Sequence, residues 1–403
     1  MSMLFTPQKL GKLEIKNRLV RAPTHENMAT AAGEVTDSLV AVYRTLAAGG
    51  VGLIFTGIMY VHPLGRSYKY QVGIDRDEVV PGLRKMADAV HKGGGKIFFQ
   101  LIHGGRQTTR KLIGQTPLAP SSTGRDPLYF VKPKEMTEQE IGEAIRAFGT
   151  AAQRAYESGA DGIHIAGAGG YLINEFLSPF FNRRNDAWGG SDKSRFRFLE
   201  EVIIAVKSSI PGDIPVTVKI NAHDHTPQEG ITPDLAKQYA AWLVRLGIDG
   251  LEVAAGTVTY SNMDMWLGQV PLNEYVSSLP FWKKPIGRLM MQPMVGKYNL
   301  REGWNLEAVK MIKPIMDGIP LFLVGGMRRV EHMEEILQNG DTQFISMCRP
   351  LIREPLLVKK IEQGETKVAS CISCNKCVGA VPNELPVRCY WQGLPVRAAR
   401  GKF

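Results

Sequence analysis

The chain has 403 residues, of which 44% are hydrophobic and 22% charged, and its formal net charge at pH 7 is +10. This composition is typical of a soluble globular enzyme, and the length accommodates one large barrel with extensions. The positive charges are scattered rather than gathered in a Lys/Arg run, which favours a basic enzyme over a nucleic-acid-binding protein.

No apolar run reaches the roughly 18 residues that predict a membrane-spanning helix. The N-terminus, MSMLFTPQKLGKLEIKNRL, has early charges and no continuous apolar core, so it does not read as a signal peptide. We therefore expect a cytoplasmic protein with no membrane or nucleic-acid partner. We also expect a small-molecule substrate and a homo-oligomer.

Eight short apolar segments alternate with helical patterns along the chain. The segments lack polar alternation, as do strands of a parallel sheet that is covered on both faces. Eight such units in a row predict an α/β fold, the (β/α)8 TIM barrel, with functional groups just after the strands. The expected strands are 17–23, 51–57, 96–102, 161–167, 214–220, 249–255, 319–326 and 342–347. The expected helices lie near 36–48, 80–92, 137–157, 192–208, 233–246, 305–317, 330–338 and 352–362.

The segment 256–304, after the sixth strand, is too long for an ordinary strand–helix connection. It is rich in Trp and Met, and we interpret it as an excursion that covers the substrate. Packing against the barrel or another subunit is the alternative. We expect the barrel to comprise residues 1–365 and a cysteine-rich extension to comprise 366–403.

The ends of strands 7 and 8 have features of a phosphate site. Gly325 and Gly326 would let backbone N–H groups approach an anion, and Arg349 can add a charge-assisted contact. In barrels the loops after these two strands frequently bind phosphate. Tight turns beside a surface arginine are the alternative interpretation.

Motifs along the whole chain resemble the Old Yellow Enzyme family of NAD(P)H:flavin oxidoreductases, especially its 2,4-dienoyl-CoA-reductase-like branch. They are LFTPQKLGKLEIKNRLVRAP, QLIHGGRQ (100–107), GGYLINEFLSPFFNRRNDAWGGS (169–191), VTVKI (216–220), VGGM (324–327) and ISMCRPLIREP (345–355). The LSPFFNRRND-WGGS block is the most specific of them. The resemblance implies a barrel that binds FMN non-covalently and is reduced by NADH or NADPH.

The resemblance also implies which residues surround the flavin. Lys219 matches the basic residue near N1, and Gln100 matches the glutamine at the pyrimidine edge. Cys348 stands where the family often has Gly before the phosphate-binding arginine. His25 would tune the flavin by hydrogen bonding near O4, or else contact it only through its backbone. The remaining matching residues are Pro23, Thr24, His25, Gly57 and Ile58.

The substrate side departs from the family pattern. Many members carry a His-x-x-His or His-x-x-Asn pair that polarises the acceptor, and here these positions are Ala166 and Gly169. Tyr171 matches the family's proton donor, and a phenol suits proton transfer to a developing enolate. We expect polarisation from His103, His164, Tyr260 or donors on the excursion. A buried structural role is the alternative for His164.

Four cysteines follow the barrel with the spacing C-x2-C-x2-C-x11-C: Cys371, Cys374, Cys377 and Cys389. This spacing suits a [4Fe–4S] cluster, with a zinc site or free thiols as alternatives. Dienoyl-CoA-reductase-like relatives have a similar motif, which passes electrons from a second flavin domain. The chain ends at Phe403 without room for such a domain, so we expect a cluster to need an external electron-transfer protein.

The leading functional prediction is an FMN-dependent ene-reductase. NAD(P)H would reduce FMN, and an α,β-unsaturated acceptor would then take hydride from N5 and a proton from Tyr171. The first alternative is an amine dehydrogenase or demethylase of the same family that passes electrons out through the cluster. The second is a non-catalytic flavin subunit that relays electrons.

Overall fold

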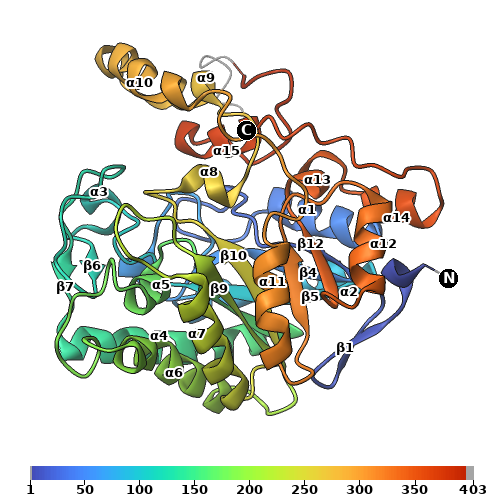
Figure 1. Ribbon diagram of the computed structural model, residues 1–403, viewed down its shortest axis with the longest axis horizontal. Helices are drawn as coiled ribbons and strands as arrows, with labels where there is room; N and C mark the ends of the chain where they lie inside the picture. Colours follow the sequence, from blue (N-terminus) through green and yellow to red (C-terminus); the bar gives the residue numbers. More distant parts are fainter. Residues whose placement is uncertain (1, 396–403) are drawn as a thin grey trace.

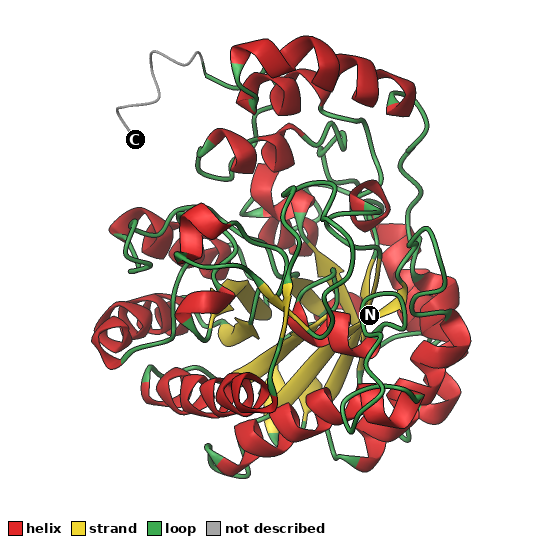
Figure 2. Ribbon diagram, turned by 90° about the vertical axis from the view of Figure 1, so that its left-hand side faces the viewer, coloured by secondary structure: helices red, strands yellow, loops and turns green. Residues whose placement is uncertain are grey.

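A closed barrel of eight parallel strands forms the centre of the protein, in a computed structural model that describes residues 2–395. The strands are neighbours in chain order, as the (β/α)8 prediction requires, and that prediction is confirmed (Figures 1 and 2). They are β3 (Leu19–Arg21), β4 (Leu53–Tyr60), β5 (Lys96–Ile102), β8 (Gly162–Gly167), β9 (Val216–His223), β10 (Gly250–Ala255), β11 (Leu321–Val324) and β12 (Phe344–Met347).

Helices surround the barrel, one after each strand, as Figure 2 shows for the red ribbons around the yellow strands. They are α1 (Asp37–Ala48), α2 (Val80–Lys92), α4 (Glu138–Glu157), α6 (Asp192–Ser208), α7 (Pro233–Arg245), α11 (Leu306–Ile312), α12 (Val330–Gln338) and α14 (Leu357–Glu362). Within residues 2–395 no helix has both the length and the apolar character needed to cross a membrane.

Short polar side chains determine where four of these helices begin. Thr36, Thr137, Ser191 and Thr232 each accept a hydrogen bond from a backbone N–H in the first turn of α1, α4, α6 and α7. Glu140 completes a capping box with Thr137. Each such cap stabilises a helix by about 1 kcal/mol, so the sequence itself fixes these helix starts.

A hairpin closes the amino end of the barrel. It consists of β1 (Gln8–Leu10) and β2 (Leu13–Ile15), which pair antiparallel. Leu10 and Ile15 are fully buried in one cluster with Phe55, Phe98 and Phe322 from the barrel interior. With the amino end filled by aromatic rings, open space for a ligand is left at the carboxyl end of the strands.

Two segments cover that carboxyl end (Figure 1). The excursion after β10 forms α8 (Asn262–Met265), α9 (Leu272–Ser278), α10 (Lys284–Met291) and the 3-10 helices η4 (Phe281–Lys283) and η5 (Gln292–Met294). The extension forms α15 (Lys376–Gly379) and η7 (Val381–Asn383). Ser277 Oγ donates to Asn383 Oδ1 at 2.9 Å, which joins the two segments.

Smaller elements complete the chain. They are η1 (Met3–Phe5), η2 (Pro63–Gly65), η3 (Asp77–Val79), α3 (Arg110–Ile113), β6 (Leu118–Ala119), β7 (Lys134–Glu135), α5 (Leu172–Leu177), η6 (Lys313–Ile315) and α13 (Arg349–Arg353). The backbone N–H of Val387 donates to the Glu26 carbonyl at 2.8 Å, so the extension folds back onto the barrel. Residues 396–403 of the expected extension lie outside the described residues, and the domain boundary at 365 stays a prediction.

Candidate active site

A cavity of about 850 Å³ opens among the carboxyl ends of the strands, the excursion and the extension. Its volume is within the range usual for cofactor and ligand sites. Most residues that the sequence analysis assigned to the flavin and the proton donor line it. These are Pro23, Thr24, His25, Ile58, Gln100, Tyr171, Lys219, Gly326, Cys348 and Arg349.

The buried carboxylate of Glu252 positions the ammonium group of Lys219 at the cavity. Lys219 in β9 places Nζ 3.1 Å from Glu252 Oε2, and His164 places Nε2 3.3 Å from the same oxygen. Burial raises the pKa of Glu252, but Lys219 and His164 outweigh burial and hold that pKa below its usual range. Glu252 is therefore ionised at neutral pH and fixes the position of Lys219.

The two histidines that we expected to polarise the substrate do not line the cavity. His164 is fully buried inside the barrel, where it contacts Thr217 Oγ1 at 2.8 Å and stacks on Phe55. His103 accepts a hydrogen bond from the Gly105 N–H, and burial lowers its pKa to about 3. Neither histidine is therefore in a position to contact a ligand in the cavity.

At the expected phosphate end, one of the two glycines faces the cavity. Gly326 has φ +71°, and a Cβ there would lie 2.3 Å from Trp304 Cζ3, so only glycine fits. Gly325 lies behind it and accepts a hydrogen bond from the Gly303 N–H at 2.6 Å. Gly57 likewise lies behind the wall, where a Cβ would meet the Glu26 carboxylate.

Arg349 connects the cavity to the two covering segments. Its Nη1 donates to the Leu267 carbonyl at 2.9 Å and to the side chain of Asn375. Arg328, which the sequence analysis missed, also lines the cavity and donates to Ser373 Oγ at 2.8 Å. Two buried guanidinium groups thus lie at the end of the cavity where the sequence predicted an anion site.

Three tyrosines form another part of the cavity lining: Tyr68, Tyr129 and Tyr171. The ring of His25 stacks on Tyr68 at 4.5 Å between centroids. Burial raises the pKa of Tyr171 well above its usual value, and Tyr68 raises it further. Tyr171 is therefore a protonated phenol at neutral pH. Burial lowers the pKa of His25 to about 4, so the His25 ring is uncharged at neutral pH.

The positions of the missing donor pair form an apolar section of the wall. Ala166 and Gly169 both line the cavity, and Ala166 packs with Ile58, Ile102 and Tyr171. Neither side chain can donate a hydrogen bond. Of the three side chains expected to polarise the acceptor, His103, His164 and Tyr260, Tyr260 is the one that lines the cavity.

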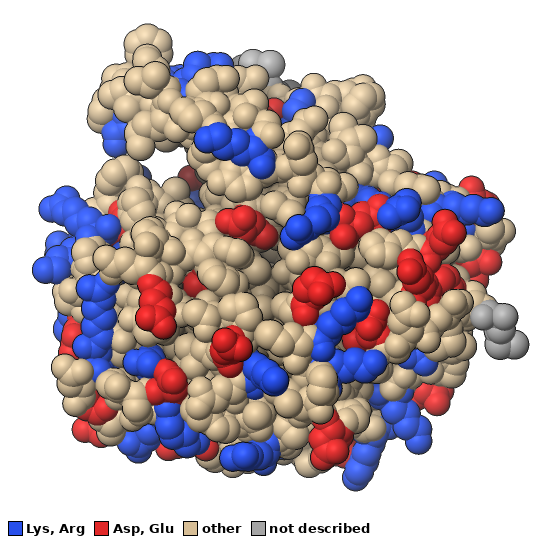
Figure 3. Space-filling model, viewed as in Figure 1, with Lys and Arg blue, Asp and Glu red and all other residues tan. Residues whose placement is uncertain are grey.

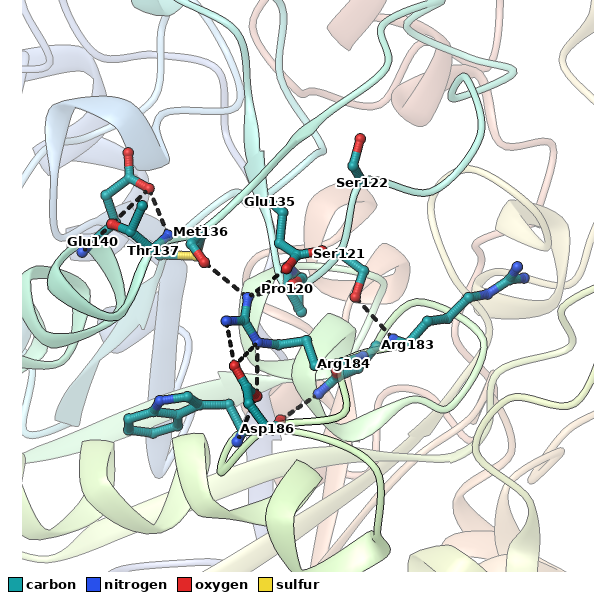
Figure 4. A network of polar contacts seen from close by, with 12 residues as sticks. Pro120, Ser121, Ser122, Glu135, Met136, Thr137, Glu140, Arg183, Arg184 and Asp186 are labelled. Carbon is teal, nitrogen blue, oxygen red and sulfur yellow. Dashed lines mark hydrogen bonds and ion pairs between the residues drawn. The ribbon is translucent and has the colours of Figure 1, made fainter.

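The most specific motif of the sequence, the RRND stretch, has a structural role. Figure 4 shows the guanidinium of Arg184 between the Asp186 carboxylate and the main chain around β6 and β7. Arg184 Nη1 donates to the carbonyls of Pro120 and Met136, each at 2.8 Å, while Nε lies 3.0 Å from Asp186 Oδ1. The motif therefore braces the loop that carries Tyr129 over the cavity.

The four cysteines of the extension line one small pocket, and Cys377 also lines the main cavity. Arg328 Nη2 lies 3.6 Å from Cys371 Sγ, and Arg353 Nη1 lies 4.0 Å from Cys389 Sγ. Among residues 2–395, however, no three Cys, His, Asp or Glu side chains are close enough to share one metal ion. The thiols thus converge without forming a single-ion site.

The cavity has the features that FMN requires. Lys219 and Gln100 offer donors at the strand ends, and the two arginines offer cations at the far end. His25 Nε2 and Ser346 Oγ are buried at the wall without a hydrogen-bond partner in the described part of the chain. Buried polar atoms normally have partners, so these two fit a polar ligand.

Comparison with known proteins identifies the family. Residues 3–286 match the NADH:flavin oxidoreductase / NADH oxidase family. An NADPH dehydrogenase of Geobacillus sp. is 35% identical over 358 residues, which cover 88% of this chain and 92% of that protein. An NADH oxidase of Thermoanaerobacter brockii is 35% identical over 393 residues, 96% of this chain and 55% of that protein. The chain thus spans about half the length of that relative.

Solved structures share the fold. A 2-naphthoyl-CoA reductase in complex with 2-naphthoyl-CoA has a TM-score of 0.83 and 25% identity, covering 96% of this chain and 56% of that one. A histamine dehydrogenase from Rhizobium sp. 4-9 has a TM-score of 0.76 and 26% identity, with coverage of 96% and 52%. An Old Yellow Enzyme homologue from Zymomonas mobilis has a TM-score of 0.70 and 24% identity, with coverage of 92% and 95%. The chain therefore belongs to the NADH:flavin oxidoreductase / NADH oxidase family, as the motifs of the sequence predicted.

Proposed function

We propose that the protein transfers hydride from NADH or NADPH, by way of FMN, to an activated α,β-unsaturated C=C acceptor. The observation that carries this proposal is that Lys219 and Tyr171, a cation and a protonated phenol, line one cavity. FMN, when bound, supplies the group that accepts hydride from the nicotinamide and returns it to the acceptor. The residues proposed to hold FMN are those of the expected set that line the cavity: Pro23, Thr24, His25, Ile58, Gln100, Lys219, Gly326, Cys348 and Arg349. Gly57 and Gly325 lie behind the wall and leave this set.

Each polar side chain has a distinct proposed role. Lys219 stabilises the negative charge that reduction places on the pyrimidine edge, while Glu252 keeps the ammonium group in position. Tyr171 donates a proton to the carbon opposite the one that receives hydride. Tyr68 packs with Tyr171 against the same apolar cluster and helps to position its ring.

The acceptor is proposed to be larger than a small cyclic enone. Ala166 and Gly169 leave room where the family's donor pair would stand, and several tyrosines and methionines line the remaining wall. The similar 2-naphthoyl-CoA reductase was solved with a bicyclic thioester, which supports a bulky acceptor. Tyr260 is the proposed donor to the acceptor's carbonyl oxygen.

A second candidate function is the oxidation of an amine. It is favoured by the similarity to histamine dehydrogenase and by the tyrosine group formed by Tyr68, Tyr129 and Tyr171. Aromatic faces attract alkylammonium ions, so such a group suits a cationic substrate. This candidate needs an electron acceptor in place of the C=C compound.

We further propose that Cys371, Cys374, Cys377 and Cys389 hold a [4Fe–4S] cluster fed by an external protein. Support comes from their spacing and from the one pocket that they line. Iron, sulfide and zinc analysis of anaerobically purified protein tests this: four irons per chain are expected, and zinc or neither metal would contradict it.

Anaerobic stopped-flow mixing tests the reductive half of the main proposal. We expect NADH or NADPH to bleach the flavin absorbance rapidly. Bleaching by an amine alone would establish the second candidate instead. Bleaching only by a reduced electron-transfer protein would show that the chain relays electrons without using a nicotinamide donor.

A further inference from the structure

The outer side of the excursion exposes large apolar side chains. In η4 and α10 the side chains of Phe281, Trp282, Ile286, Leu289 and Met290 are 59–86% exposed. Because η4 runs directly into α10, the last four follow the i, i+4, i+7, i+8 pattern of one helix face. Single exposed apolar residues are ordinary, but a contiguous apolar face marks an interaction site.

A second segment adds to this face. Leu128 and Phe130, on the loop before β7, are also exposed. Lys283 Nζ lies 5.7 Å from the centroid of the Phe130 ring, so the loop and the excursion adjoin. We call the exposed apolar side chains of both segments the apolar rim: Leu128, Phe130, Phe281, Trp282, Ile286, Leu289 and Met290.

Basic residues accompany the apolar rim without acidic ones. From Tyr275 to Arg301 the chain contains no Asp or Glu. Its cations there are Lys283, Lys284, Arg288, Lys297 and Arg301. In Figure 3 the projecting lobe at the upper left is mainly tan with blue atoms, in contrast to the mixed red and blue of the barrel. The chemistry of this surface is therefore apolar and cationic together.

This combination decides which occupant fits. In a two-fold symmetric contact between copies, the same surface faces itself. Such a contact would gather Lys283, Lys284 and Arg288 of both copies in one region, with no carboxylate of the segment to offset them. An anionic bilayer satisfies both properties, because apolar side chains enter the acyl boundary while Lys and Arg meet lipid phosphates. Trp282 is of the residue type enriched at that boundary.

We propose that the apolar rim docks the protein on an anionic membrane surface, with α10 lying in the plane of the interface. The inner side of the same segment, at Leu279, Met291 and Met294, lines the cavity. Docking therefore brings the cavity to the bilayer, where apolar molecules concentrate. Only this last consequence, the delivery of an apolar acceptor, rests on the proposed function; docking itself does not.

Flotation of the full-length protein with vesicles tests the docking. We expect it to float with vesicles of phosphatidylcholine and phosphatidylglycerol, to float weakly with phosphatidylcholine alone, and to be released by high salt. The variant Lys283→Gln/Lys284→Gln should partition about 25-fold more weakly, about five-fold for each charge. The matched control is Lys85→Gln/Lys92→Gln, which removes the same charge from exposed positions of α2 and should bind as the unmodified protein does.

A third variant, Phe281→Ser/Leu289→Ser, tests the apolar contribution and should also lose binding. Equal losses in the α10 variant and the α2 control would overturn the proposal, because net charge rather than this surface would then be responsible. Absence of binding at low salt would overturn it as well. A dimer that dissociates in Phe281→Ser/Leu289→Ser, without vesicle binding by the unmodified protein, would identify the rim as a subunit contact instead. None of these readouts depends on activity.

Discussion

Replacing Lys219 with Met should destabilise the flavin-free protein by about 3–5 kcal/mol, because it removes one partner of a buried ion pair. Glu252 is fully buried, only 18% of the Lys219 side chain is exposed, and their charged atoms are 3.1 Å apart. Solvent therefore screens the pair little. In the variant, His164 alone would face the carboxylate.

Urea denaturation followed by circular dichroism measures this loss. The double variant Lys219→Met/Glu252→Gln should recover most of it, since no uncompensated charge then remains. The folded-state pKa of Glu252 is lowered, so its stabilisation is present above the unfolded-state value of about 4.3 and is lost as pH falls through the folded pKa. The difference between the variant and the unmodified protein should accordingly shrink as pH falls below about 4.3 and through the lowered folded-state pKa of Glu252. A loss below about 1 kcal/mol at neutral pH, or a double variant no more stable than the single one, would refute the coupling.

Three further outcomes are expected. Tyr171→Phe should slow reoxidation of reduced flavin by an enone about 10²–10⁴-fold and spare reduction by NAD(P)H; equal losses in both half-reactions would give Tyr171 a structural role. Arg349→Ala should weaken FMN binding about 10- to 150-fold in a fluorescence titration, and unchanged affinity would remove Arg349 from the phosphate site. Ala166→His/Gly169→Asn should speed small enones about 10²-fold in steady-state assays and slow bulky ones. Gly169 has φ +78°, where a side chain strains the backbone, so circular dichroism and flavin content must first establish that the variant folds; a folded, flavin-loaded variant without that gain would show that another wall polarises the acceptor.

The strands and their order could be predicted because the strands of a parallel barrel have a recognisable sequence pattern. Its strands are buried on both faces, so they appear as short continuous apolar runs separated by helical patterns. Lys219 and Gln100 were assigned through the family resemblance, and the strand pattern placed them in the fifth and third expected strands. Lys219 lies within β9 and Gln100 lies near the end of β5, and both line the cavity at the carboxyl face of the barrel.

Contacts made by loops could not be predicted in this way. Tyr68 and Tyr129 lie in connections whose sequence carries no periodicity, and only the folded chain brings them to Tyr171. Arg349 appeared as a phosphate ligand alone, because its bonds to Leu267 and Asn375 depend on how the extension folds back. Glu252 did leave a signal, since a charged residue inside an apolar strand needs a buried partner.

The central claim, hydride transfer to an activated C=C acceptor, is tested most directly by the oxidative half-reaction. The protein, reduced anaerobically with one equivalent of NADPH or NADH, is mixed with a bulky α,β-unsaturated carbonyl compound, and the flavin absorbance is followed. The account predicts that oxidised flavin returns as a saturated product forms in equal amount, faster than in the Tyr171→Phe variant. Flavin that stays reduced with a panel of such acceptors, but is reoxidised by a one-electron acceptor, would contradict it.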